Sequence, residues 1–208
     1  MENRALPLYP LPAWARWAAG IWLVIWVPTY WHVWGPSSFF FLCDLAVLLA
    51  CVGIVTGNAL LISSQAVSSL VVDTAWLIDI VWKLLFGWHL IGGTEYFFDS
   101  HYPLAVRLMS MFHVALPFVL LMSLRRTGYD PRALRLQSAI AVAAMIASRI
   151  AGPQKNINFA FTDPFFRRSW GPAPIHLAVI LAPLIVLIYV PTHFALKHFF
   201  RPPQTAHE

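Results

Sequence analysis

Residues 104–124 read LAVRLMSMFHVALPFVLLMSL, an apolar stretch that carries a histidine, His113, and a proline, Pro117, near its middle. A helix of this length crosses about 30 Å of hydrocarbon. Pro117 has no N–H, so the carbonyl of His113, four residues earlier, loses its helical hydrogen-bond partner. At membrane depth such a break is tolerated where the backbone is buried in protein or lines a wet cavity. The spacing therefore predicts that His113 lies on the wall of a polar cavity, although a lone intramembrane histidine is often a packing residue.

The rest of the chain has the same apolar character. It has 208 residues, of which 59% are hydrophobic and 11% are charged. Soluble domains contain about 25% charged residues. This composition excludes an ordinary soluble domain and predicts an all-α polytopic membrane protein that forms a single transmembrane domain over residues 1–208. Cys43 and Cys51 lie about two helical turns apart in one apolar run, so they cannot pair there.

Apolar runs between turn signals predict about six transmembrane helices in one bundle. Their expected ranges are 13–34, 38–57, 60–87, 104–124, 133–151 and 174–198. With six spans, seven of the 14 Lys and Arg residues share one side of the membrane with both termini: Arg4, Arg16, Arg125, Arg126, Arg132, Lys197 and Arg201. The positive-inside rule then places both termini in the cytoplasm and loops 88–103 and 152–173 outside. The net charge of +5 is thus a topology signal rather than a nucleic-acid footprint, and we expect a bacterial cytoplasmic membrane.

In this topology the ionisable side chains gather in the outer half of the membrane. An ionisable group at that depth costs a few kcal/mol, so it usually faces the bundle interior and marks function. The candidate catalytic residues are His113, Cys43, Asp44 and Asp79. The candidate substrate-binding residues are His32, Arg107, Arg149, Asn156, Asn158 and His176. Asp73, in the third predicted helix, receives no role.

The residue types of the first set fit acyl transfer or hydrolysis. A thiol becomes a good nucleophile when an imidazole takes its proton, and a carboxylate can orient that imidazole. Cys43 and Asp44 are adjacent, so on a helix they point about 100° apart and cannot both face one point without distortion. No G-x-S-x-G, H-E-x-x-H, G-x-G-x-x-G or P-loop motif is present.

Structural roles compete with these functional ones. Asp79 and Lys83 are four residues apart and could neutralise each other. Arg149 could reach the interface as a snorkelling residue, and Arg107 could do so or pair with Asp79 or Glu95. His32 could belong to an aromatic belt, and Cys43 could be a small buried hydrophobe. A metal site in the outer region, which matches no zinc spacing, would draw on His89, Glu95, Asp99, His101 and His176.

Several stretches also carry a family resemblance. WHVWGPSSFFFLCD, SMFHVALP, RRTGYDPRALRLQ and KNINFAFTDP resemble an uncharacterised family of small bacterial integral membrane proteins. The order LCD, FH and N-x-N-F-x-F-x-x-P more distantly resembles the androgen-induced-gene and ether-lipid acyltransferase type of membrane hydrolase. That resemblance implies six-helix-class proteins that act on lipid acyl esters. It also implies Cys43 as nucleophile, His113 as base, and Asn156 and Asn158 in the loop motif.

The sequence thus supports two functions. The first is a membrane-embedded lipid or acyl-ester hydrolase or acyltransferase with an outward-facing polar cavity. The alternative is a non-enzymatic accessory subunit or a lipid- or pigment-binding component of a larger membrane complex, and a small transporter ranks lower because no inverted repeat is evident. Membrane lipids are the expected partners, with other membrane subunits under the alternative and no nucleic acid under either. No particular cofactor is indicated.

Overall fold

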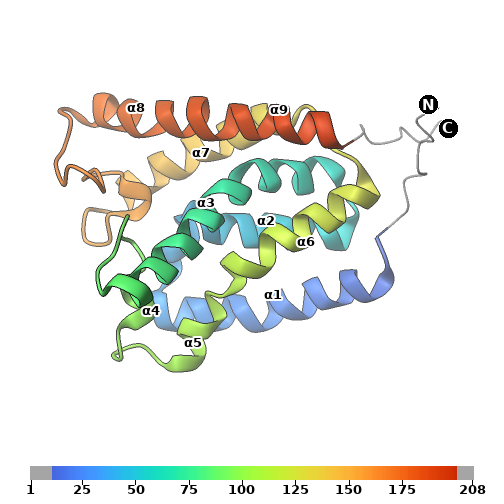
Figure 1. Cartoon of the computed structure of the whole chain (residues 1–208), viewed down its shortest axis with the longest axis horizontal. Helices are drawn as coiled ribbons and strands as arrows, with labels where there is room; N and C mark the ends of the chain where they lie inside the picture. The colour runs from blue at the N-terminus through green and yellow to red at the C-terminus, as the bar shows by residue number, and fades with distance from the viewer. Residues whose placement is uncertain (1–10, 201–208) are drawn as a thin grey trace.

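The computed structural model describes residues 11–200, and every regular element within them is helical. The long helices lie roughly alongside one another in a bundle (Figure 1). They are α1 Ala13–Trp34, α2 Leu42–Thr56, α3 Ala59–Phe86, α6 Phe112–Thr127, α7 Ala133–Ile150, α8 Ala173–Pro183 and α9 Val190–Phe199, with the π-helical η3 Leu184–Tyr189 joining α8 to α9. The short ones are η1 Pro36–Phe40, α4 Glu95–Phe98, α5 Leu104–Met109 and η2 Ile157–Phe159. The all-α prediction is confirmed for the described residues.

Three helical stretches are long and apolar enough to cross a membrane: Leu104–Thr127, Ala133–Ile150 and Ala173–Phe199. α2 is apolar but shorter. Side chains such as Leu187, Phe194 and Phe199 on α8–α9 are largely exposed, as expected for a surface that faces lipid rather than water. The three apolar helices and this exposed apolar surface indicate a membrane protein.

The second predicted span is divided. Its first residues form η1, Phe41 is extended with ψ 134°, and α2 then begins at Leu42. α2 ends at Gly57, whose φ of 71° is a left-handed conformation that glycine adopts without steric cost. Asn58 then caps α3, because its side chain accepts a hydrogen bond from the N–H of Leu61. The division places the first turn of α2 inside the bundle rather than at its end.

The helix is continuous from His113 through Pro117, where a kink was expected, and the interruption lies just before His113 instead. The helix is interrupted at Ser110 and Met111, between α5 and α6. There the N–H of His113 bonds to the carbonyl of Ser110 at 3.1 Å, and that of Val114 bonds to Met111 at 2.9 Å. These bonds span three residues, as in a tightened 3₁₀ turn. The interruption and Pro117 thus flank His113 on both sides.

α3 is the central helix, and it packs against α2, α6 and α7. Gly53 of α2 allows the close approach, since a Cβ built there would lie 3.0 Å from Cγ1 of Ile62 on α3. Trp26, Ile62 and Leu120 are fully buried around this axis. The loops that follow α3 and α7 lie together at one end of the bundle, beside α4 and α5 (Figure 1). That end carries the cavity.

Candidate functional site

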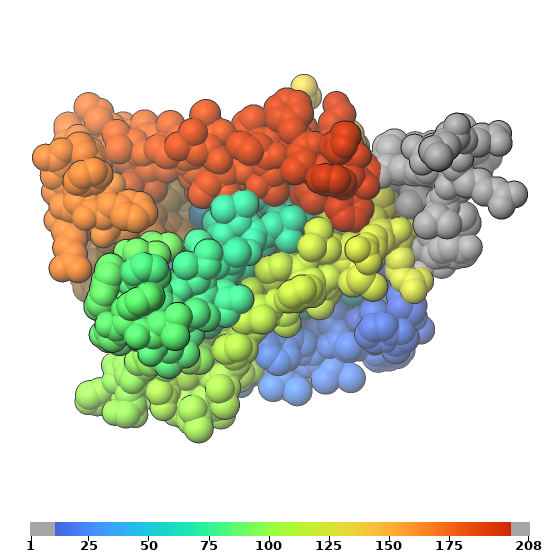
Figure 2. Space-filling view, viewed as in Figure 1, coloured from blue at the N-terminus to red at the C-terminus, as the bar shows by residue number. Residues whose placement is uncertain are grey.

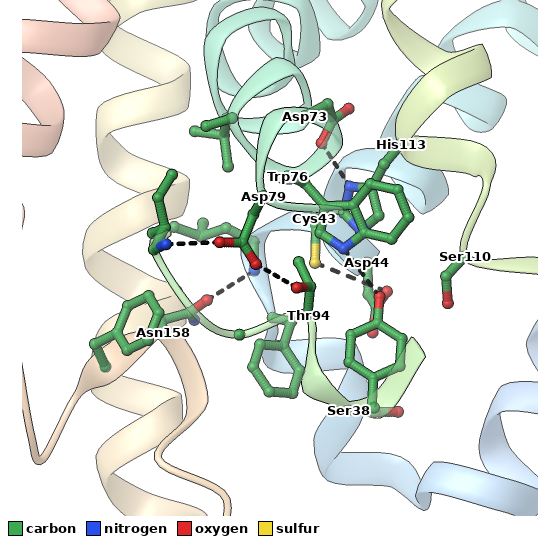
Figure 3. Close-up of a pocket in the computed structure, with 18 of the residues that line it drawn as sticks. Ser38, Cys43, Asp44, Asp73, Trp76, Asp79, Thr94, Ser110, His113 and Asn158 are labelled. Carbon is green, nitrogen blue, oxygen red and sulfur yellow. Dashed lines mark hydrogen bonds and ion pairs between the residues drawn. The ribbon is translucent and has the colours of Figure 1, made fainter. Parts of the chain in front are cut away.

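A cavity of about 710 Å³ lies between α1, α2, α3 and α6, beneath the two long loops. Its wall is mainly apolar and aromatic. The polar side chains on the wall include Ser38, Cys43, Asp44, Ser69, Asp73, Asp79, Thr94, Ser110, His113 and Asn158. Figure 3 shows most of them converging from different helices. A cavity is therefore present where these polar side chains meet, but its wall is more apolar than that of the predicted polar cavity.

His113 is held by a carboxylate. Its Nδ1 lies 2.8 Å from Oδ1 of Asp73 on α3, and both side chains are buried. An ionised carboxylate only accepts hydrogen bonds, so an ionised Asp73 would require the proton of a neutral His113 to be on Nδ1 and would leave the lone pair on Nε2. The imidazole also stacks on Trp76, with ring centroids 4.6 Å apart and planes 20° apart. Both contacts fix the ring, and the arrangement is that of a base oriented by a carboxylate.

α3 supplies both supports of this ring because Asp73 and Trp76 are three residues apart and share a helix face. The indole N–H of Trp76 in turn donates to the phenol oxygen of Tyr96 at 3.2 Å, which links α3 to α4. Tyr96 lies in the outer loop, where burial raises its pKa far above the ordinary value. Its hydroxyl is therefore protonated at neutral pH and available as a donor.

Cys43 and Asp44 lie in the first turn of α2 and both line the cavity. The thiol sulfur is 4.0 Å from Oδ1 of Asp44. The first N–H groups of a helix have no intrahelical acceptor. Asn158 Oδ1 accepts a hydrogen bond from the N–H of Leu42 at 2.9 Å.

Asp79, expected beside His113, is used elsewhere. Its carboxylate accepts hydrogen bonds from the N–H groups of Ile91 at 2.6 Å and Gly92 at 3.2 Å, and from the hydroxyl of Thr94. His89 Nδ1 is 3.0 Å away. Asp79 therefore positions the loop that covers the cavity. Asp73, rather than Asp79, is the carboxylate that contacts His113. Lys83 does not neutralise it, because its ammonium donates to the carbonyl of Gly87 at 2.6 Å.

Asn156 and Asn158 line the cavity, and their amides also hold the loop after α7. Asn158 Nδ2 donates to the carbonyl of Phe40 at 2.7 Å and to Ser148 Oγ at 3.0 Å. Asn156 Oδ1 accepts from the N–H groups of Phe161 and Thr162 at 2.9 and 3.0 Å. Both asparagines have positive φ, 43° and 52°, which asparagine tolerates better than most residues. These contacts connect the loop to η1 and so fix the start of α2.

The other four predicted binding residues lie outside the cavity wall. Arg107 donates to the carbonyls of Phe97 and Tyr102, both at 3.1 Å, and not to Asp79 or Glu95. Arg149 donates to the carbonyl of Ala160 at 2.9 Å. His176 Nε2 donates to the carbonyl of Phe159 at 2.9 Å. His32 is exposed and makes no hydrogen bond to another residue of the 11–200 range. Arg107, Arg149 and His176 therefore stabilise the loops whose carbonyl groups they bind.

The outer loop after α7 is also fixed by a carboxylate. Burial works to raise the pKa of Asp163, but hydrogen bonds from the N–H groups of Phe166 and Phe165 and from the indole of Trp170 outweigh it. The pKa of Asp163 therefore lies below its ordinary value, and the group is ionised at neutral pH. These hydrogen bonds to Asp163 therefore fix the conformation of the outer loop after α7.

Within residues 11–200, no three His, Cys, Asp or Glu side chains lie close enough together to hold a metal ion. The histidines proposed as outer ligands have other partners, as His101 bonds to Asp99 at 2.7 Å and His89 bonds to Asp79. No family profile, curated protein or solved structure matches this chain. The chemistry of the cavity is therefore argued from its own residues.

Sequence reasoning missed Asp73 and Trp76 as site residues. An acidic residue and an aromatic one three positions apart in an apolar helix were visible as a shared face. The rotation of α3 relative to α6 was not visible, and it decides which of Asp73 and Asp79 meets His113.

Proposed function

We propose that this protein is a six-span membrane enzyme that transfers or hydrolyses acyl groups through a thioester on Cys43. His113 is the base and Asp73 positions it. The observation that carries the proposal is the buried His113–Asp73 pair, 2.8 Å apart, which lines the same cavity as the thiol of Cys43. The distant resemblance to membrane acyl hydrolases agrees with the same two residues, Cys43 and His113.

The six-span topology rests on the helices and on the basic residues. α1, η1–α2, α3, α5–α6, α7 and α8–α9 each run along the bundle, so successive spans alternate in direction (Figure 1). The basic residues of the α6–α7 connection, Arg125, Arg126 and Arg132, lie at the end opposite the cavity. The positive-inside rule then puts that end and both termini in the cytoplasm and opens the cavity toward the outer leaflet.

The proposed chemical step uses Cys43, His113 and Asp73, and it requires the thiol and the imidazole to approach each other, since they share no hydrogen bond within residues 11–200. The sulfur of Cys43 attacks the carbonyl carbon of the acyl ester while Nε2 of His113 takes the thiol proton. The C–O bond of the ester breaks, and the imidazolium returns the proton to the leaving alkoxide. Water, or an acceptor alcohol deprotonated by the same Nε2, then releases the acyl group from sulfur. Asp73 keeps Nδ1 protonated and stabilises the transient imidazolium.

The first turn of α2 offers stabilisation for the oxyanion of the tetrahedral intermediate. Amide N–H groups of Cys43 and Asp44 lie at the helix start, where they have no intrahelical acceptor. Such preorganised donors stabilise the charge that develops on the carbonyl oxygen. The division of the second span into η1 and α2 is what brings these donors to membrane depth.

The proposal places the entry of the acyl chain at the side of the bundle, between α3 and α8. Figure 2 shows the surface hollowed between α8 and α3. Val72 of α3 and Leu184 of η3 belong to the cavity wall on these two sides. An amphiphile in the bilayer would pass between them without leaving the hydrocarbon, which favours a lipid substrate over a water-soluble one.

Turnover of para-nitrophenyl octanoate by the purified protein in vesicles tests the function. Asp73→Asn keeps the size of the side chain but favours the wrong imidazole tautomer, so we expect kcat to fall by about 10²–10⁴-fold. We also expect the pH dependence of kcat to shift, and a purely packing role for Asp73 would not move it. Circular dichroism of the variant provides the folding control.

Absence of ester consumption by the wild-type protein, with this probe and with glycerolipid esters, would contradict the enzymatic proposal. The cavity would then belong to a lipid-binding component of a membrane complex. Stable comigration with fixed partners in mild detergent would be the corresponding positive result.

A further inference from the structure

The cavity wall carries more acidic than basic groups. Asp44, Asp73, Asp79 and Glu95 line it, while Lys155 and the imidazole of His113 are the basic groups on the wall within the described residues. The ammonium of Lys155 is bound to the carbonyl of Trp34 and, at 3.2 Å, to the hydroxyl of Ser37. It therefore holds α1 to η1 rather than compensating the buried carboxylates.

Two of these carboxylates are incompletely partnered. Asp44 is 5% exposed, and its one contact within residues 11–200 that qualifies as a hydrogen bond is the weak thiol at 4.0 Å. Asp73 is 1% exposed, and its Oδ2 has no hydrogen-bond partner in the same part of the chain. A buried carboxylate without a partner is costly. By contrast Asp79 accepts several hydrogen bonds, so its role is complete without a ligand.

Aromatic rings surround these carboxylates. Tyr30, Trp34, Trp76, Tyr96, Tyr102 and Phe112 all contribute to the wall. The centroid of the Trp34 ring lies 4.1 Å from that of Tyr102 and 5.6 Å from that of Tyr96. The faces of such rings attract organic cations, and clusters of them bind quaternary ammonium groups. Carboxylates and aromatic faces together are the two features that recognise an ammonium ion.

We infer that the cavity binds an amphiphile with an organic ammonium group, which pairs with Asp44 among these rings while its apolar chain extends between α3 and α8. When the bound amphiphile is the substrate, it is an acyl ester of an amino alcohol. In that case the inference rests on the proposed function. The 4.0 Å between Cys43 and Asp44 suits it, because an ammonium bound at Asp44 places a nearby ester next to the thiol. A phosphate-bearing headgroup fits less well, since no arginine lines this wall within residues 11–200.

The test measures how amphiphiles protect Cys43 from alkylation by N-ethylmaleimide. Protein carrying Cys51→Ala, held in maltoside micelles, leaves Cys43 as the single reactive thiol. We expect hexyltrimethylammonium to slow alkylation in a saturable manner. Nonyl alcohol, which has the same number of carbon atoms, and nonanoate, which has the opposite charge, should protect weakly or not at all.

Asp44→Asn is the decisive variant, and Asp99→Asn is its matched control at a partly exposed carboxylate outside the cavity wall. We expect Asp44→Asn to raise the half-protecting concentration of hexyltrimethylammonium about tenfold or more, and Asp99→Asn to leave it unchanged. Comparing rates with and without the amphiphile in each variant removes any change in the reactivity of the thiol itself.

Equal protection by nonyl alcohol or nonanoate, or undiminished protection in Asp44→Asn, would overturn the inference. If Asp44→Asn does not fold, the three amphiphiles on the parent protein still decide it. Protection by the cation without turnover of para-nitrophenyl octanoate would refute the enzymatic function alone. Turnover of that ester without selective protection would refute the ammonium site alone.

Discussion

His113→Ala is expected to lower kcat for para-nitrophenyl octanoate by about 10²–10⁴-fold while the purified protein stays folded. The substitution removes the group that takes the thiol proton and later returns it to the leaving oxygen. It also leaves Asp73 as a buried carboxylate without its imidazole partner, so the melting temperature should fall as well. Rates are therefore compared per mole of protein that elutes as a monodisperse peak.

His193→Ala is the matched control for this prediction. His193 is likewise a buried histidine, and its Nδ1 shares a hydrogen bond of 2.6 Å with the hydroxyl of Tyr129, but it does not line the cavity. We expect this variant to lose stability and to keep kcat within a few-fold of the wild-type value. Equal loss of kcat in the two variants, or unchanged kcat in His113→Ala, would remove His113 from the chemical step.

Cys43→Ala should reduce turnover to the rate seen without protein, because alanine offers no nucleophile in the first turn of α2. Cys51→Ala should leave turnover unchanged within about two-fold, since Cys51 is buried in the core and does not line the cavity. Both substitutions remove one sulfur from the same helix, so their comparison separates chemistry from packing. Residual turnover in Cys43→Ala that still depends on His113 would point to another nucleophile on the wall.

Much of the helical framework could be predicted from the sequence, because apolar runs and their punctuating Gly, Pro and Asn residues are local signals. The range 60–87 corresponds to α3 at Ala59–Phe86, and 133–151 corresponds to α7 at Ala133–Ile150. The interruption of 38–57 by η1 was not predicted. It depends on contacts from distant residues, since Asn158 accepts from Leu42 and donates to Phe40.

The candidate site was predicted in part. The position of His113 on a cavity wall followed from its spacing to Pro117, and Cys43 and Asp44 line the same cavity. The partner of His113 could not be predicted, because it depends on how α3 is rotated about its axis. Asp73 and Asp79 are six residues apart and so point to different sides of α3, one toward His113 and the other toward the loop at Ile91.

Polar loop residues were harder to interpret than helical ones. Arg107, Arg149 and His176 bind backbone carbonyls, which are acceptors that leave no trace in the sequence. Such contacts satisfy the carbonyl groups of irregular loops. A charged residue near a membrane end is therefore as compatible with a loop brace as with a substrate contact.

Detection of an acyl group on Cys43 tests the central claim most directly. The purified wild-type protein is mixed with para-nitrophenyl octanoate, quenched in acid within the first turnover, digested and examined by mass spectrometry. The account predicts an octanoyl adduct on the peptide that contains Cys43, removable by hydroxylamine as a thioester is. Turnover with no adduct there, or with the adduct on another residue, would contradict it.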